Sequence, residues 1–432
     1  MASTHIENTV SDILLSSVVP GRVTGEDKVH ELTNMDLAMK LHYIKGLYFF
    51  KSEAMDGTDI FKLKEAMFPW LVLYSPISGR IRLPEKGRPF IKCNDGGVRI
   101  VEAKCSRTLE EWLGMKDRCL DDQLVYNHAL GPDLNFSPLV FIQLTWFKCG
   151  GLSVGLSWAH ILGDILSASD FINMWGQILA GNSPTQSLDM PNDGKPQFPS
   201  PLAKKPFSVE KVDPVGDYWL SASNCKMETH SFHVTPKQLN HVFVKACGLN
   251  QVAKAPHFEL LSALMWKSFA KVGGNSVPRI VTICNNNSHR RENENPSNGQ
   301  VISIVRADFY IEDANLSELM KLIDEERMDE GKMIEELVEM ENGKSDFLVY
   351  GANLTFVNLE EANMYGLKMN GHAPVFVNYT ISGVGNKGVV LVLPGPKNLE
   401  TGCQEGRTIT VILPENQMLE LKNELREEWS II

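Results

Sequence analysis

The sequence carries little positive charge for its length, and this excludes one broad class of function. Its 432 residues include 42 lysines and arginines against 53 aspartates and glutamates, which gives a formal net charge of −11. Proteins that bind nucleic acids present a basic patch that neutralises the phosphates. We therefore expect no nucleic-acid partner.

Long apolar runs are also missing. No run reaches the roughly 18 residues that a membrane-spanning helix needs. The first residues, MASTHIENTVSDILLSS, lack the basic and apolar regions of a secretory signal. We expect a cytoplasmic chain with no transmembrane segment, which reaches a membrane only through a partner.

Cysteines are few and scattered. They form neither a C-x-x-C pair nor a Cys/His cluster with the spacing of a zinc site, so no metal site is predicted. Without an export signal, we expect the thiols to be reduced and buried. The eight are Cys93, Cys105, Cys119, Cys149, Cys225, Cys247, Cys284 and Cys403.

A proline-rich segment divides the chain into two parts of similar size. Six of the 22 prolines lie between residues 184 and 206, where neither a helix nor a central strand can continue. We expect an N-terminal domain over residues 1–183, a crossover over 184–206 and a C-terminal domain over 207–432. Helix and strand patterns alternate in both parts, which predicts a mixed α/β fold.

A histidine lies where a predicted strand passes into a predicted helix. PLVFIQLTWFKCGG and LSVGLSWAH predict two strands joined by a turn at Cys149–Gly151, and the second strand ends at His160. Apolar residues then recur at helical spacing from Asp164 towards Gly181, a typical stop. His160 and Asp164 form an H-x-x-x-D pattern at this connection.

Two interpretations of His160 follow from the residues alone. A lone histidine beside a core strand is most often a packed side chain. In the other interpretation, a neutral imidazole takes the proton from a hydroxyl or amine as that group attacks a thioester. Asp164, one helical turn later, would then hold the loop or orient the ring. The spacing does not decide between these.

A glycine-rich stretch, GVGNKG (Gly383–Gly388), matches the G-x-G-x-x-G pattern of dinucleotide sites. Such a site needs a helix directly after the glycines, whose N-terminus holds the pyrophosphate. Here strand-like runs, FVNYTIS and VVLVLP, precede and follow the glycines. We expect a β-hairpin turn and no dinucleotide cofactor, and no cofactor-binding residue is identified.

Several stretches resemble the plant BAHD acyltransferases. They include LTNMDL (Leu32–Leu37), YSPISGRI (Tyr74–Ile81), the region around His160 and NLTFVN (Asn353–Asn358). The resemblance implies two similar-sized mixed α/β domains of the chloramphenicol-acetyltransferase-like type, joined by a long crossover. It also implies a channel between the domains, with acyl-CoA or coenzyme A as ligand, His160 as general base and Asp164 as its companion.

The chain departs from that family at its second signature, D-F-G-W-G followed by K-P. KMNGHAP (Lys368–Pro374) stands in its place. The family's aspartate there pairs with an arginine in an earlier stretch, for which this chain has asparagines within residues 281–291. Near the first motif, Ile165 replaces a usual glycine. Loss of both partners avoids an unpaired buried charge, so we interpret the signature as replaced as a unit.

These departures resemble one branch, the eceriferum-two (glossy-type) proteins, as do MDLAMKLHY and FVNYTISGVGNKGVVLV. The branch acts in cuticular wax formation with the ketoacyl-CoA synthase of the fatty-acid elongase, at the cytosolic face of the endoplasmic reticulum. It allows very-long-chain acyl-CoAs to be extended past the length that the synthase reaches alone. The resemblance implies an accessory protein in which His160 and Asp164 are inherited and not used for transfer.

Two alternatives stay open. One is an acyl-CoA-dependent O- or N-acyltransferase with His160 as general base, which would release free coenzyme A. The other is a scaffold with no ligand channel, which tight binding of acyl-CoA would contradict.

Overall fold

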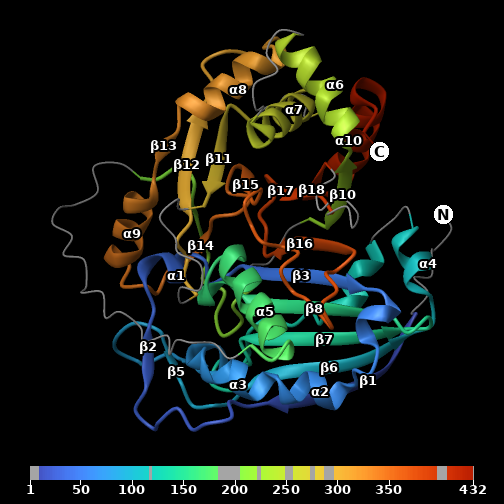
Figure 1. The fold of residues 1–432 in the computed structure, drawn as a ribbon. Helices are drawn as coiled ribbons and strands as arrows, with labels where there is room; N and C mark the ends of the chain where they lie inside the picture. Colours follow the sequence, from blue (N-terminus) through green and yellow to red (C-terminus); the bar gives the residue numbers. More distant parts are fainter. Residues whose placement is uncertain are drawn as a thin grey trace.

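Two large β-sheets organise the chain, one below the other in the view of Figure 1. The computed structural model describes residues 9–115, 119–182, 205–220, 225–248, 256–272, 278–286, 296–396 and 406–431. Most of the expected crossover, residues 184–206, therefore lies outside the described residues. The mixed α/β, two-domain prediction is confirmed.

The first sheet has six strands in the order β1-β6-β7-β8-β3-β16. β7 and β8 pair as antiparallel neighbours, as the sequence predicts. In sheet order the strands are β1 (Val10–Val18), β6 (Val98–Cys105), β7 (Val140–Phe147), β8 (Leu152–Ala159), β3 (Tyr43–Phe50) and β16 (Phe376–Ser382).

The second sheet has seven strands and belongs to the second half of the chain. In sheet order they are β10 (Met227–Val234), β18 (Arg407–Pro414), β17 (Val389–Pro394), β15 (Leu354–Asn358), β11 (Ile280–Asn285), β12 (Val301–Arg306) and β13 (Met328–Asp329). Two small sheets join β14 (Asp346–Leu348) to β9 (Glu210–Val212), and β2 (Val29–Glu31) through β5 (Phe90–Lys92) to β4 (Arg80–Arg82).

Helices cover both sheets. Those of the first half are α1 (Asn34–Ala38), α2 (Ile60–Glu65), α3 (Met67–Val72), α4 (Leu109–Leu113) and α5 (Ile165–Leu179). Those of the second half are α6 (Pro236–Cys247), α7 (His257–Val272), α8 (Leu316–Glu325), α9 (Gly331–Met340) and α10 (Glu415–Trp429). The helix predicted after Asp164 is α5, which is fastened to α3 where Phe171 stacks on Trp70 with ring centroids 3.9 Å apart.

β16 is a strand of the second half that completes the sheet of the first half. It pairs antiparallel with β3, with Tyr379 opposite Gly46. A side chain at position 46 would place its Cβ 2.9 Å from the Tyr379 ring, so a glycine is needed there. The buried Tyr379 hydroxyl contacts the hydroxyl of Tyr48. The two halves are thus interlocked through this strand.

Two expectations from the sequence are wrong. GVGNKG is not a hairpin turn, because β16 before it and β17 after it belong to different sheets. The turn instead leads the chain from one sheet to the other, with positive φ at Gly383 and Gly388. The cysteines are also not uniformly buried, because Cys149 is exposed in the β7–β8 turn.

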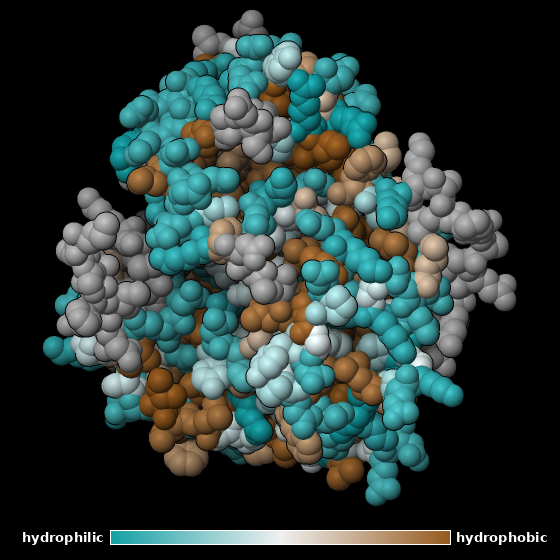
Figure 2. Space-filling model, turned by 180° about the vertical axis from the view of Figure 1, so that it is seen from behind, coloured by the Kyte–Doolittle hydropathy of each residue, from teal (hydrophilic) through white to brown (hydrophobic). Residues whose placement is uncertain are grey.

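The surface is unevenly polar. From behind, hydrophilic residues cover most of the upper lobe, while hydrophobic residues gather along the lower edge (Figure 2). The edge strand β1 exposes Ile13, Leu14 and Leu15 in succession, and α2 exposes Phe61. Within the described ranges, we find no helix with the length and apolar character to cross a membrane.

Candidate active site

The connection after β8 places the predicted histidine. β8 ends at Ala159, and His160–Leu162 form a single 3₁₀ turn, η4, before α5 begins. Gly163 has φ +148°, and a Cβ there would lie 2.8 Å from the Ser167 side chain and from the Ser297 backbone nitrogen. Only glycine fits, because the loop packs closely against both neighbours.

Asp164 is the N-cap residue of α5. Its Oδ1 accepts a hydrogen bond from the backbone N–H of Ser167 at 2.9 Å. Its own N–H donates to the carbonyl oxygen of Ser297 at 3.1 Å, which ties the loop to the second half of the chain. A carboxylate at this position satisfies a free N–H and interacts favourably with the helix dipole. This geometry gives Asp164 a loop-holding role.

The ring of His160 is closed off from solvent. The residue has an exposed fraction of 0%, and its Nε2 lies 3.0 Å from the hydroxyl oxygen of Tyr350. Burial lowers the pKa of the imidazole to about 4, against an opposing effect of the Asp164 charge. The ring is therefore neutral at physiological pH, but it is a weak base, since general bases work best with a pKa near the operating pH.

Tyr350 brings a second partner into the site. Its hydroxyl donates to Oε1 of Gln300 at 3.0 Å, and its side chain is fully buried. Burial raises the pKa of this hydroxyl well above its ordinary value. The Tyr350 oxygen is thus hydrogen-bonded to both the His160 ring and the Gln300 amide, where an acceptor hydroxyl would have to approach His160.

A second buried histidine, His42, holds the backbone at Tyr350. Nε2 of His42 accepts hydrogen bonds from the backbone N–H groups of Val349 at 3.1 Å and Tyr350 at 3.3 Å. An accepting Nε2 places the ring proton on Nδ1. Burial, and then the nearby His160, lower the pKa of His42 to about 3, so it stays neutral as well. Its ring meets that of Tyr350 edge-on, with centroids 4.9 Å apart.

Asn298 links the two halves across the site. Its Nδ2 donates to the carbonyl oxygen of His160 at 2.9 Å and to Oδ1 of Asp36 at 2.8 Å. Asp36 is buried in α1, where it also completes a capping box with Thr33. The sequence indicates His160, Asp164 and the stretch around Asp36, but no motif indicates Asn298 or its contacts.

The replaced second signature forms a tight turn. Asn370 and Gly371 both have positive φ, and Nδ2 of Asn370 donates to the carbonyl oxygens of Ala54 at 3.1 Å and Asp56 at 2.9 Å. An asparagine tolerates positive φ because its short side chain bonds locally. Neutral amide contacts to the first half therefore hold this loop.

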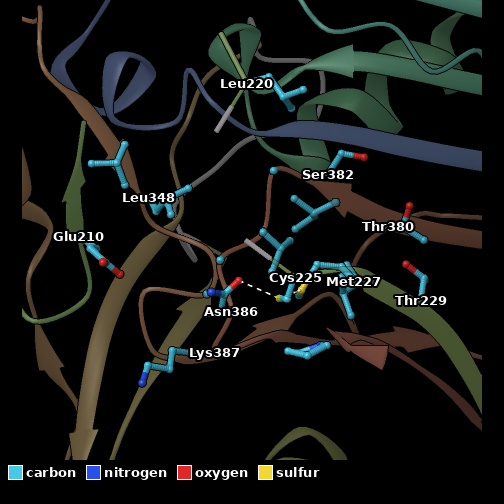
Figure 3. Close-up of a pocket in the computed structure, with 18 of the residues that line it drawn as sticks. Glu210, Leu220, Cys225, Met227, Thr229, Leu348, Thr380, Ser382, Asn386 and Lys387 are labelled. Atoms are coloured by element: carbon cyan, nitrogen blue, oxygen red, sulfur yellow. Dashed lines mark hydrogen bonds between the residues drawn. The ribbon is translucent and has the colours of Figure 1, made fainter. Parts of the chain in front are cut away.

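A cavity of about 1360 Å³ lies between the two sheets. Its walls include Lys45 of β3 from the first half and Met227 of β10 from the second half, so both halves contribute. Met227 and Ser382 of β16 are labelled in Figure 3. Cys225 points towards the GVGNKG turn, where its thiol lies 3.0 Å from Oδ1 of Asn386. His160 is not among the lining residues of this cavity.

Two lysines at this cavity are paired with carboxylates. Lys45 forms an ion pair with Asp122 at 2.9 Å, and Lys211 forms one with Glu341 at 2.8 Å. No cluster of three or more histidine, cysteine or acidic side chains suited to a metal ion occurs in the part of the chain that the structure describes.

Comparison with known proteins finds similarity over nearly the whole chain. The model of the transferase family matches residues 10–428. Protein ECERIFERUM 2 of Arabidopsis thaliana is 43% identical over 430 residues, which covers 96% of this chain and 98% of that protein. Protein ECERIFERUM 26 of the same plant is 39% identical over 423 residues, with coverage of 98% and 96%.

Solved structures agree on the fold. Vinorine synthase superposes with a TM-score of 0.71 at 17% identity, over 95% of this chain and 96% of that one. TRI101 of F. graminearum, complexed with coenzyme A and deoxynivalenol, gives a TM-score of 0.68 at 15% identity, over 93% of this chain and 98% of that one. At these identities the likeness shows the fold alone.

Proposed function

The chain belongs to the BAHD transferase family, and from that premise we propose that it is an accessory protein of the fatty-acid elongase. It would work with a ketoacyl-CoA synthase, so that very-long-chain acyl-CoAs are extended further for cuticular wax. The near-full-length similarity to Protein ECERIFERUM 2 and Protein ECERIFERUM 26 supports this choice of branch.

One observation carries the proposal that His160 performs no transfer. The ring is completely buried and its Nε2 contacts Tyr350, so no acceptor substrate can reach it without moving that side chain. A helper of condensation needs no such base, because the nucleophile belongs to the synthase. His160 and Asp164 then serve the fold, through the contacts of the β8–α5 connection.

The ligand we propose is acyl-CoA, held without turnover. Shielding a long acyl tail from water gains about 0.8 kcal/mol for each CH₂ group, so a helper that covers part of the tail favours elongation. We place the protein at the cytosolic face of the endoplasmic reticulum through its partner.

The test is an elongation assay in a host that lacks the longest acyl chains. The chain is co-expressed with a ketoacyl-CoA synthase, and fatty acids are profiled by length for the unmodified protein, His160→Ala and the exposed-site control His241→Ala. We expect all three to extend the products equally. Loss of extension with a His160→Ala protein that still folds would contradict the accessory function without catalysis.

A second candidate is an acyl-CoA-dependent O- or N-acyltransferase. The intact strand-to-helix geometry of His160 and the capping contact of Asp164 favour it. This function requires release of coenzyme A when the unmodified protein meets an acyl-CoA and an alcohol or amine. A release rate that does not change on His160→Ala excludes it.

A further inference from the structure

The Tyr350 oxygen lies where the hydroxyl of an acceptor would stand beside His160, and in the resting site Nε2 donates to it, because the tyrosine proton goes to Gln300. Nε2 and the tyrosine oxygen lie 3.0 Å apart, within the range for a proton transfer during nucleophilic attack. We propose that the Tyr350 side chain fills the position beside His160 that an acceptor hydroxyl would take in acyl transfer. Removing it uncovers a His160-dependent transfer from acyl-CoA to a small phenol or to water.

The backbone around Tyr350 holds the side chain in this position. His42 accepts from the N–H of Tyr350, and the N–H of Gly385 donates to the Tyr350 carbonyl oxygen at 2.9 Å. Gly351 packs so closely that a Cβ on it would lie 2.4 Å from the Gly385 oxygen. The backbone at Tyr350 is therefore held in place on both sides, by hydrogen bonds and by close packing.

The Tyr350 hydroxyl is also held by hydrogen bonds. It donates to Gln300 at 3.0 Å while its oxygen contacts the His160 ring. A substrate hydroxyl at the same point would have to displace both hydrogen bonds, of which the one to His160 is fully buried and the one to Gln300 is partly buried. The native protein thus keeps the base covered in its resting state.

The cavity between the sheets ends close to this pair. Leu348 and Gly351, on either side of Tyr350 in the sequence, line the cavity, as do Ser382 and Gly383 (Figure 3). Gly383 is packed against His42, since a Cβ on it would lie within 3.6 Å of the His42 Cα. Tyr350 and His160 themselves do not line the cavity, but residues on both sides of Tyr350 in the sequence do, so the buried pair lies directly behind this wall.

The uncovered reaction is balanced without any further reagent. With Tyr350 removed, Nε2 of His160 is free to lose its proton in favour of Nδ1. The phenol oxygen bonds to the thioester carbonyl carbon as Nε2 of this tautomer takes the phenol proton. The C–S bond then breaks, and the coenzyme A thiolate receives that proton from the imidazolium. The products are an aryl ester and free coenzyme A; with water in place of phenol, they are a fatty acid and free coenzyme A.

The experiment removes the side chain and supplies it from solution. Tyr350→Ala leaves a space with the shape of phenol, so the full-length variant is incubated with palmitoyl-CoA and phenol. We expect equal amounts of phenyl palmitate and coenzyme A, at a rate about 100-fold above that of Tyr350→Ala/His160→Ala, the lower end of a general-base contribution. Tyr350→Phe, whose ring still fills the space, should form no ester.

A second variant covers the case in which Tyr350→Ala does not fold. Tyr350→Leu keeps most of the buried apolar volume and vacates the hydroxyl position, so water should replace it and palmitoyl-CoA should be hydrolysed in a His160-dependent way. The proposal is wrong if the folded variant releases coenzyme A no faster than its His160→Ala partner. This proposal rests on the proposed function only in that acyl-CoA binds. The elongation assay of His160→Ala tests the accessory function separately, because it measures product length and not release of coenzyme A.

Discussion

The ammonium group of Lys40 lies 2.7 Å from a carboxylate oxygen of Asp346, and both side chains are almost fully buried. Lys40 precedes β3, whereas Asp346 begins β14 and the segment that leads to Tyr350. The pair thus attaches the segment that carries Tyr350 to the first half of the chain.

Breaking this pair should strongly destabilise the fold. Lys40→Met leaves the Asp346 carboxylate buried without its cation, and we expect a loss of about 3–5 kcal/mol in the free energy of unfolding. The exposed pair of Lys226 and Glu415, at 3.0 Å, is the matched control, and Lys226→Met should cost below about 1 kcal/mol. Urea denaturation measures both. Equal losses would show that burial of the first pair does not matter.

The hydroxyl of Tyr350 should contribute to stability as well as closing the site. Tyr350→Phe keeps the packing but leaves the buried Nε2 of His160 and the half-buried Gln300 oxygen without their partner, which should cost about 1–3 kcal/mol in urea denaturation. Tyr310→Phe, at an exposed position, should leave the stability unchanged. If the two variants unfold at the same urea concentration, the hydrogen bonds of Tyr350 contribute nothing.

Asp164 should behave as a helix cap in stability measurements. Asp164→Ala removes the acceptor for the Ser167 N–H and should cost about 1 kcal/mol, whereas Asp164→Asn keeps an acceptor and should cost less. Chemical denaturation of the two variants gives the comparison. An asparagine variant as unstable as the alanine variant would mean that the charge matters more than the cap.

Acid should destabilise the protein through its two buried histidines. The folded pKa values are about 3 for His42 and about 4 for His160, below the ordinary 6.5. Only the unfolded chain takes up these protons between pH 6.5 and about 4, so the stability is fully present above pH 6.5 and is lost as the pH falls. Each histidine should contribute about 1.4 kcal/mol per pH unit.

Urea denaturation at a series of pH values from 7 to about 5 measures this slope. His42→Gln should make it shallower by one histidine, while His241→Ala, which lies at an exposed position, should leave it unchanged. A slope that is the same in all three proteins would mean that the His42 ring does not stay neutral in the folded state.

The local structure around His160 could be predicted because its signals are local. The Cys149–Gly151 turn, the strand that ends at His160 and the helix that begins after Asp164 are all present. Turn residues, strand patterns and helical spacing act within about 20 residues of each other, so a single sequence records them.

The partners of His160 could not be predicted in the same way. Tyr350 is 190 positions away in the sequence, and no motif in the stretch around it indicates a contact with His160. Its position depends on His42 and on the close packing of Gly351 against Gly385, which are tertiary contacts without a local pattern. Residues 376–382 likewise have a strand pattern, but nothing in them says which sheet they join.

That last strand has a consequence for how the protein is made. Until the ribosome has delivered β16, β3 remains an open edge of the first sheet, with its backbone groups and the space beside Gly46 uncovered. At 5–20 residues per second, the roughly 220 residues between His160 and Ser382 take tens of seconds to synthesise. During that interval the edge of β3 stays open to pairing with other chains, and a chain that ended at the proline-rich crossover would lack the strand that closes this edge.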